Sequence, residues 1–167
     1  MNIREAKKND IPEITKVIRK SYHTVAKRYD LTRENCPKHP SNCETNWVLG
    51  DFERGVQYYV AESDNGIIGC MALEKASEQT CYLERLAVIP AERNKGVGTL
   101  LVKNFIKKAG DIGASTIGIG IISKQEDLKV WYQKIGFVET GHKAFTHLPF
   151  DVAFMAVSYT HLTLPTN

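Results

Sequence analysis

The sequence predicts an α/β protein whose central sheet is mixed but largely antiparallel and is flanked by helices. Three observations carry this prediction. Segments with the apolar period of a helix alternate with short β-branched and aromatic runs, in the order βααβββαβαββ. Turn residues separate neighbouring strand-like runs, as Asp64-Asn65-Gly66 does in the middle of the chain. Hydrophobic residues make up 43% and charged residues 25% of the chain, which is ordinary for a globular domain.

The N-terminal region should form a short strand and then a helix. Asn2–Ala6 has the composition of a strand. Asp10 followed by Pro12 is typical of a helix start, because proline in the first turn removes an N–H that has no partner there. The apolar face of this helix is formed by Ile14, Val17 and Ile18.

A second helix and three strands are expected next. Ser41, with Glu44 three residues later, has the form of a capping box and predicts a helix that runs to about Arg54. Turn signals then separate three runs that are rich in β-branched and aromatic residues. These predicted strands are Val56–Ser63, Ile67–Glu74 and Tyr82–Ile89.

The C-terminal half should contain two helices and three strands. Gly110 and Gly113 are typical of the end of the first helix, and Gly136 is typical of the end of the second. Gly118 and Gly120 share one face of a strand, where they allow either close packing against a helix or clearance for a ligand such as a pantetheine arm. The expected elements are a helix at residues 98–109, a strand at Ser115–Ile122, a helix at Glu126–Ile135 and strands at Phe137–Gly141 and Val152–Val157.

Charge and composition exclude several classes of protein. The formal net charge is +3 and the basic residues are scattered, whereas a nucleic-acid-binding protein usually has a clustered basic face. No apolar run reaches the ~18 residues that a membrane span needs, and the first residues lack the apolar core of a signal peptide. We therefore expect a cytoplasmic protein that binds neither nucleic acid nor membrane, and whose 4 cysteines are thiols.

The segment from Tyr82 to Leu101 has the features of an anion-binding site. A predicted strand ends at Pro90, a basic and glycine-rich loop follows, and a helix starts near Gly98. Glycines allow backbone N–H groups to approach a phosphate, and the positive end of the helix dipole favours an anion. The alternative is a tight turn without a ligand. Neither the P-loop nor the dinucleotide-binding glycine pattern matches this segment.

Two motifs in this order resemble those of the GCN5-related N-acetyltransferases, the GNAT superfamily. Leu86-Ala87-Val88-x-Pro90 followed by Arg93-x-x-Gly96-x-Gly98 is similar to the acyl-coenzyme A signature of that family. Trp131-Tyr132-Gln133-Lys134-Ile135-Gly136-Phe137 resembles its C-terminal motif. The resemblance implies a GNAT-like fold and acetyl-CoA as cosubstrate, without a metal. The residues it implies for cosubstrate binding are Leu86, Ala87, Val88, Arg93, Asn94, Lys95, Gly96, Val97, Gly98 and Thr99.

The resemblance also implies roles in the transfer of an acetyl group to a primary amine within a ternary complex. The N–H of Val88 is the candidate that stabilises the oxyanion, because the family leaves N–H groups of this strand unpaired. Tyr132 is the candidate proton donor to the leaving thiolate, since a phenol is protonated at neutral pH. The alternative is that Tyr132 only packs with Trp131 in the core.

Glu84 is the candidate general base. In a regular strand it shares a face with Leu86 and Val88, so that its carboxylate projects toward the reacting carbon. Some members of the family carry a glutamate at this place. The alternatives are an ordinary strand carboxylate that pairs with Arg85 or a lysine, and a mechanism that relies on water alone.

Two histidines raise further possibilities. His147 lies in the expected turn between the last two strands, which in the family often borders the acceptor pocket, and it is a candidate substrate-binding residue or a solvated loop histidine. Cys36, His39 and Cys43 are three soft ligands in a short loop, but a fourth zinc ligand is not close in the sequence. We expect no bound metal.

These inferences assign residues 1–157 to a single GNAT-like domain. Ser158–Asn167 has no clear period, and we expect it to be a non-native tail without a function. The resulting prediction is an acetyl-CoA-dependent N-acetyltransferase that acts on a small-molecule or peptide amine. A homodimer is a possible assembly. The alternative is a non-catalytic, CoA-binding regulatory module with the same fold. The sequence does not identify the acceptor.

Overall fold

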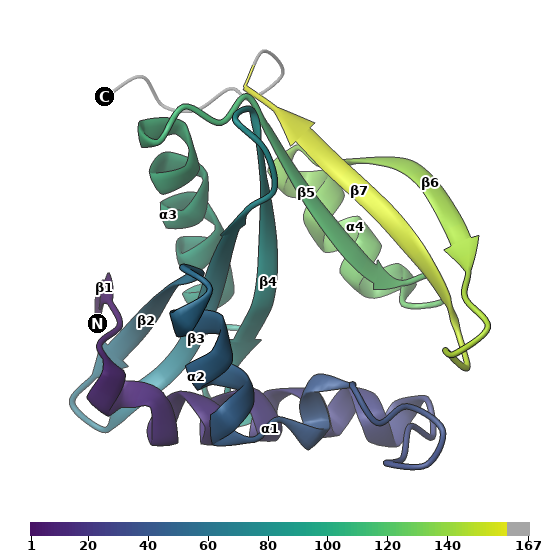
Figure 1. Cartoon of the computed structure of the whole chain (residues 1–167), viewed down its shortest axis with the longest axis horizontal. Coiled ribbons are helices and arrows are strands. Elements are labelled where there is room, and N and C mark those ends of the chain that lie inside the picture. The colour runs from purple at the N-terminus through teal and green to yellow at the C-terminus, as the bar shows by residue number, and fades with distance from the viewer. Residues whose placement is uncertain (160–167) are drawn as a thin grey trace. The chain divides into compact units, whose positions relative to one another are not determined.

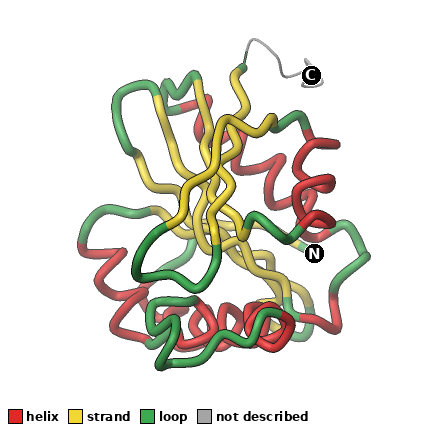
Figure 2. The backbone as a smooth tube through the Cα atoms, turned by 90° about the vertical axis from the view of Figure 1, so that its right-hand side faces the viewer, coloured by secondary structure: helices red, strands yellow, loops and turns green. Residues whose placement is uncertain are grey.

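The computed structural model describes residues 1–159 and confirms the predicted order of elements. Helices flank a seven-stranded sheet with the strand order β1-β2-β3-β4-β5-β7-β6 (Figure 1). The β4–β5 pair is parallel, and the β1–β2, β2–β3, β5–β7 and β6–β7 pairs are antiparallel. Figure 2 marks the same segments along the backbone. The elements are β1 (Asn2–Glu5), α1 (Ile11–Arg28), α2 (Thr45–Glu53), β2 (Gln57–Ser63), β3 (Gly66–Lys75), β4 (Thr80–Val88), α3 (Val97–Asp111), β5 (Thr116–Ile122), α4 (Glu126–Ile135), β6 (Val138–Ala144) and β7 (Asp151–Ser158).

The chain forms two compact units, and β4 contributes to both. The first unit consists of Met1–Glu74 and Leu83–Phe105, and the second consists of Lys75–Tyr82 and the described chain from Ile106 onward. The first unit therefore holds α1, α2, the first three strands and the segment that resembles an acyl-CoA signature. The second unit holds α4 and the last three strands.

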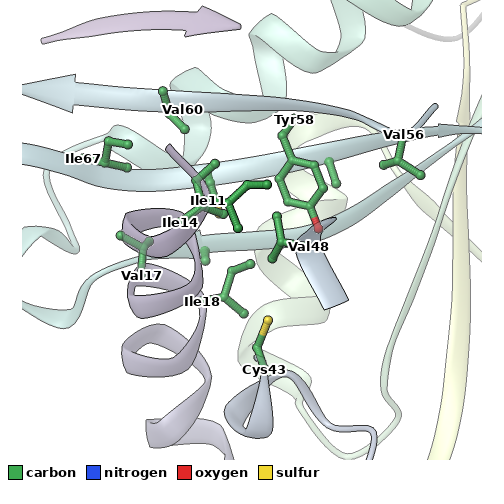
Figure 3. Packing of buried hydrophobic residues seen from close by; sticks show 13 residues of the cluster. Ile11, Ile14, Val17, Ile18, Cys43, Val48, Val56, Tyr58, Val60 and Ile67 are labelled. Carbon is green, nitrogen blue, oxygen red and sulfur yellow. The ribbon is translucent and has the colours of Figure 1, made fainter. Parts of the chain in front are cut away.

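In the first unit, α1 and α2 cover one face of β2 and β3. Ile14, Ile18 and Val48 are fully buried and pack with the ring of Tyr58 in one apolar cluster (Figure 3). Burial of these side chains supplies most of the stability of such a unit, because each removes apolar surface from water. The first half of α3 covers the opposite face, where the absence of a side chain at Gly69 leaves room for Val97 and Leu101.

The start of α1 agrees with the sequence prediction, and ion pairs hold it to the sheet. Asp10 precedes the helix and Pro12 lies in its first turn. Arg4 in β1 makes ion pairs with Asp10 at 2.9 Å and with Glu62 in β2 at 3.2 Å. This arginine thus joins β1, β2 and the N-terminus of α1, and its hydrogen bonds to Asp10 lower the pKa of the Asp10 carboxyl.

The predicted start of the second helix is wrong. Ser41 belongs to a short 3-10 helix, Pro40–Asn42, and α2 begins at Thr45 after Glu44. His39 precedes the 3-10 helix and its Nδ1 accepts a hydrogen bond from the N–H of Ser41. Pro40 fixes this tight turn, and it leaves no helix for Ser41 to cap.

In the sheet, β5 lies between β4 and β7, and within the second unit α4 lies behind β5 and β7 in the view of Figure 1. Gly118 faces the ring of Tyr82, since a Cβ atom there would lie 3.0 Å from a ring carbon. Gly118 therefore makes room for the Tyr82 side chain of the neighbouring strand and not for a helix, and clearance for a ligand stays untested. Lys129 pairs with Glu126 at 3.5 Å and with Glu139 at 3.2 Å, and so connects α4 to β6.

The described part of the expected tail belongs to the second unit. The strand β7 extends to Ser158. The ring of Tyr159 packs against Gly110, and its hydroxyl donates a hydrogen bond to the carbonyl of Ile106. Ser158 and Tyr159 of the expected tail therefore pack within the second unit, and residues 160–167 lie outside the described chain.

Candidate active site

Arg85 interrupts the regular backbone of β4. Its φ angle is 50°, in the left-handed region that residues other than glycine rarely occupy. Its carbonyl accepts a hydrogen bond from the thiol of Cys70 in β3, and regular pairing to β3 is present again where the N–H of Ile89 donates to the carbonyl of Ile68. Such an irregularity redirects the side chains on either side of it.

The interruption changes which residues share a face. Arg85 contacts Asp51 and Trp47 of α2, and Ala87 lies in the core cluster that α1 and α2 form. Leu86 and Val88 therefore point to the other face. The charges that act on Glu84 are those of Glu74 in β3 and of its neighbour Arg85, followed by those of Asp51 and Arg54. The predicted common face of Glu84, Leu86 and Val88 depends on the alternation of a regular strand, which the left-handed backbone of Arg85 interrupts between Glu84 and Leu86, and it stays a prediction.

Side chains from α1 bind the backbone of β4 just after this irregularity. The N–H of Val88 donates to Oγ of Ser21 over 3.2 Å, and the hydroxyl of Tyr22 donates to the carbonyl of Leu86 over 2.9 Å. Leu86 and Val88 are half-buried, whereas Ala87 is buried. The candidate oxyanion donor is thus held by a serine hydroxyl, and this bond lies at the long end of the usual range.

Arg93 is bound within the first unit. Its Nε donates to the carbonyl of Val88 at 3.3 Å, and its Nη1 donates to Oγ1 of Thr24 at 3.0 Å. Its Nη2 donates to the carbonyl of Ser21 at 2.7 Å and lies 3.3 Å from its Oγ. The guanidinium therefore joins α1 to the end of β4, and a phosphate-binding role for Arg93 stays a prediction.

The loop that follows has the geometry of an anion cradle. Asn94 and Gly96 have φ angles of 63° and 84°, and space is open around the Cα of Gly96. Within residues 1–159, none of the backbone N–H groups from Asn94 to Thr99 donates a hydrogen bond to the chain; the first such bond in α3 joins Leu100 to Gly96. These donors, at the positive end of the α3 dipole, fit a phosphate group.

The remaining residues of this segment surround the cradle. Lys95 is exposed, and its Nζ makes an ion pair of 2.9 Å with a carboxylate oxygen of Glu92. Val97, the first residue of α3, is buried, and Gly98 and Thr99 in the same turn are half-buried. The cradle thus consists of backbone N–H donors, and the long side chain of Lys95 lies beside them.

Glu84 has no hydrogen bond or ion pair within residues 1–159. Partial loss of hydration raises the pKa of its carboxyl, the negative charge of Glu74 adds to this increase, and the charge of Arg85 opposes it. A carboxylate with a raised pKa and free oxygens can accept a proton from a ligand. These properties suit a general base.

Asp51 organises the charges beside Glu84. Its carboxylate is buried, at 7% exposure, and accepts a hydrogen bond of 2.5 Å from Tyr58. It also pairs with Arg54 at 2.8 Å and with Arg85 at 3.1 Å. Three donors thus satisfy this buried carboxylate, which a buried charge requires.

The second unit holds the other two candidates. Tyr132 is buried, at 5% exposure, and its ring makes edge contacts with Trp131 at 4.9 Å and Phe137 at 5.3 Å between centroids. His147 is exposed in the loop between β6 and β7, as predicted, and its ring contacts Phe145. Both roles stay predictions.

Sequence reasoning missed the residues that hold β4 in place. Ser21, Tyr22, Trp47 and Asp51 lie on α1 and α2 and contact β4 only in the folded chain. An aspartate at a helix position that faces the core was the one available signal, because buried carboxylates require partners. The left-handed conformation of Arg85 had no signal in the sequence.

The soft residues of the loop before α2 do not form a metal centre. No group of three or more metal-binding side chains lies together in residues 1–159. Cys36 and Cys43 are buried free thiols, and burial raises the pKa of Cys43 to about 11. Burial lowers the pKa of His39 to about 4, so that this imidazole is neutral at pH 7.

An open groove of about 650 Å³ runs between α1 and Glu44–Asn46, and no residue predicted for catalysis or binding lines it. None of the helices in the described part of the chain has the length and apolar character that crossing a membrane requires.

Comparison with known proteins identifies the family. Residues 54–139, slightly more than half of the chain, match the family described as "Acetyltransferase (GNAT) domain". The chain therefore belongs to the GNAT superfamily, as the two motifs predict. Over 86 residues it is 36% identical to "Uncharacterized N-acetyltransferase YvbK" of Bacillus subtilis (strain 168), a match that covers 52% of this chain and 55% of that protein. The chain thus matches about half the length of its curated relatives.

Solved structures confirm the fold class. The PaiA N-acetyltransferase from Thermoplasma acidophilum, in complex with coenzyme A, has a TM-score of 0.79 and 18% identity over 95% of this chain and 98% of that one. The ribosomal-protein-S18-alanine N-acetyltransferase from Escherichia coli has a TM-score of 0.75 and 14% identity over 99% and 97% of the two chains. At these identities the likeness establishes the fold alone.

The contacts of Arg93 predict a structural role that needs no ligand. We expect Arg93→Lys to lower the free energy of unfolding by about 1–3 kcal/mol, because lysine cannot reach Val88, Ser21 and Thr24 together. Urea denaturation of the ligand-free protein measures this change. The exposed ion pair of Lys95 provides the control: Lys95→Gln should change stability by less than about 0.5 kcal/mol. Equal stability of Arg93→Lys and the wild type would contradict the assignment.

Proposed function

We propose that this protein transfers an acetyl group from acetyl-CoA to the primary amine of a small molecule or peptide, by direct reaction in a ternary complex. The observation that carries the proposal is the row of unpaired N–H groups from Asn94 to Thr99, directly after the irregular end of β4. This row suits the pyrophosphate of coenzyme A. A structural relative in complex with coenzyme A supports the same ligand.

The residues of β4 supply the polar groups for the reaction. As the amine nitrogen attacks the thioester carbonyl carbon, negative charge develops on the carbonyl oxygen, and the N–H of Val88 stabilises it. This N–H must then exchange Oγ of Ser21 for the carbonyl oxygen, and the long 3.2 Å bond favours that exchange. Ser21 retains its contact with Arg93, which keeps the displaced hydroxyl beside the strand.

Two protons move in the proposed reaction. The acceptor amine loses a proton to Glu84, directly or through water, when its nitrogen bonds to the acetyl carbon. The carbon–sulfur bond then breaks, and the phenol of Tyr132 gives a proton to the leaving thiolate. In this mechanism the acetylated amine and coenzyme A leave as products, and His147 is a contact for the acceptor.

The test of the proposed function is coenzyme A thiol release from acetyl-CoA with a panel of amines and a control without acceptor. The panel contains diamines, aminoglycosides, amino acids, and peptides with a free N-terminus or lysine. We expect acceptor-dependent release with at least one class, and mass spectrometry should find the acetylated amine. Binding of acetyl-CoA without release across the panel would favour a regulatory module, and absence of binding would contradict the proposal.

The role of Tyr132 gives a prediction about kinetics. We expect Tyr132→Phe to lower kcat by about 10²- to 10⁴-fold, because the thiolate leaves without its proton donor. The affinity for acetyl-CoA, measured by calorimetry, should stay within about threefold, since the ring contacts with Trp131 and Phe137 remain.

Tyr82→Phe is the matched control for Tyr132→Phe. Tyr82 is also in the second unit. It is 44% exposed, and its ring faces Gly118. This change should leave kcat unaltered. A Tyr132→Phe enzyme with the turnover of the wild type would show that Tyr132 only packs in the core.

The role of Glu84 gives a prediction about pH. Because the pKa of Glu84 is raised, kcat/KM of the wild type should increase with pH through a limb that lies above the ordinary range of a glutamate. We expect Glu84→Gln to remove this limb and to lower kcat/KM by about 10²- to 10⁴-fold. Glu74→Gln is the control: it removes a charge that raises the pKa, so the limb should move to lower pH and persist. An unchanged profile in Glu84→Gln would rule out the role.

A further inference from the structure

The guanidinium of Arg85 is fixed on one edge and free on the other. Its Nε donates to Oδ2 of Asp51 at 3.1 Å, and its Cζ lies 5.7 Å from the ring centroid of Trp47. Its side chain is 20% exposed. Neither Nη atom makes a hydrogen bond within residues 1–159. Two parallel N–H donors on a fixed guanidinium match the two oxygens of a carboxylate.

The partners of Asp51 explain why Arg85 remains available. Oδ2 of Asp51 also accepts from Tyr58, and Oδ1 accepts from Arg54, so this carboxylate is saturated. Arg54 makes a second ion pair, with Glu74 at 2.7 Å. The two arginines and the two carboxylates therefore balance each other in charge. Asp51 orients Arg85 through its Nε and leaves both Nη groups for a ligand.

Glu84 adds a negative charge directly beside Arg85. Glu84 directly precedes Arg85 in β4, and the charges of both Arg85 and Asp51 act on its carboxyl. The Cα atoms of Glu84 and Arg85 are ~3.8 Å apart. A simple anion would be repelled by Glu84, and a simple cation by Arg85. A ligand with an ammonium and a carboxylate a few bonds apart complements both charges.

We infer that the acceptor is a free amino acid, whose carboxylate binds the two Nη groups of Arg85 while its amine lies beside Glu84. This inference rests on the proposed acetyl transfer and narrows it to one class of acceptor. It also explains why a buried aspartate orients an arginine at a strained position of β4. A peptide amine lacks a carboxylate at that distance, and it is a poor acceptor on this account.

The first experiment compares matched acceptors with the wild-type protein. Coenzyme A release is measured with a set of amino acids, with their amides and with the amines that lack the carboxylate. We expect kcat/KM for the best amino acid to exceed that for its amide by about 10- to 100-fold, because the amide cannot form the charge-assisted bidentate contact with Arg85. Amides or simple amines that react as well as the acids would overturn the inference but leave the proposed function intact. No release with any amine in this set or in the broader panel would overturn both.

The second experiment uses variants of the two arginines that contact Asp51. Arg85→Gln should reduce the preference for acid over amide to within about threefold, mainly by raising KM for the acid. Arg54→Gln removes the other ion pair of Asp51 and should keep the preference of the wild type. An equal loss of kcat/KM for acid and amide in Arg85→Gln would assign Arg85 to holding α2 on β4 and overturn its role in binding. The ratio for the wild type alone remains decisive if Arg85→Gln does not fold.

Discussion

The left-handed backbone at Arg85 is the constraint on which the rest of the candidate site depends. Before this residue β4 is an ordinary strand, and after it the polar atoms of the strand bind side chains of α1. Ser21 accepts from the N–H of Val88, and Tyr22 donates to the carbonyl of Leu86. Because these are single side-chain contacts instead of a continuous ladder, a ligand can replace one of them without breaking the sheet.

Two arginines stabilise this arrangement from inside the first unit. Arg93 binds the carbonyls of Val88 and Ser21, and Arg85 binds the carboxylate of Asp51. The guanidinium of Arg93 and the Nε of Arg85 therefore position backbone and side chains, while uncharged N–H groups from residue 94 to residue 99 remain for phosphate. Backbone donors at a helix start suit this role because no side-chain conformational entropy is lost when a ligand binds to them.

Much of the fold could be predicted from the sequence because it depends on local signals. Asp10 and Pro12 mark the start of α1, and Asp64-Asn65-Gly66 marks the β2–β3 hairpin. The cap predicted at Ser41 was wrong, because the 3-10 helix after His39 replaces a helix start of similar composition. The conformation of Arg85 and the partners of Arg93 could not be predicted, since both follow from contacts with α1 and α2 that exist only after folding.

The most direct test of the central claim is a calorimetric titration of the protein with coenzyme A and with pantetheine, which lacks the pyrophosphate and the nucleotide. The unpaired N–H groups from Asn94 to Thr99 are the site assigned to the pyrophosphate. The account predicts that coenzyme A binds at least about 10-fold more tightly, and that this advantage falls as salt concentration rises. Equal affinities for the two compounds would contradict the assignment of this loop as a phosphate cradle.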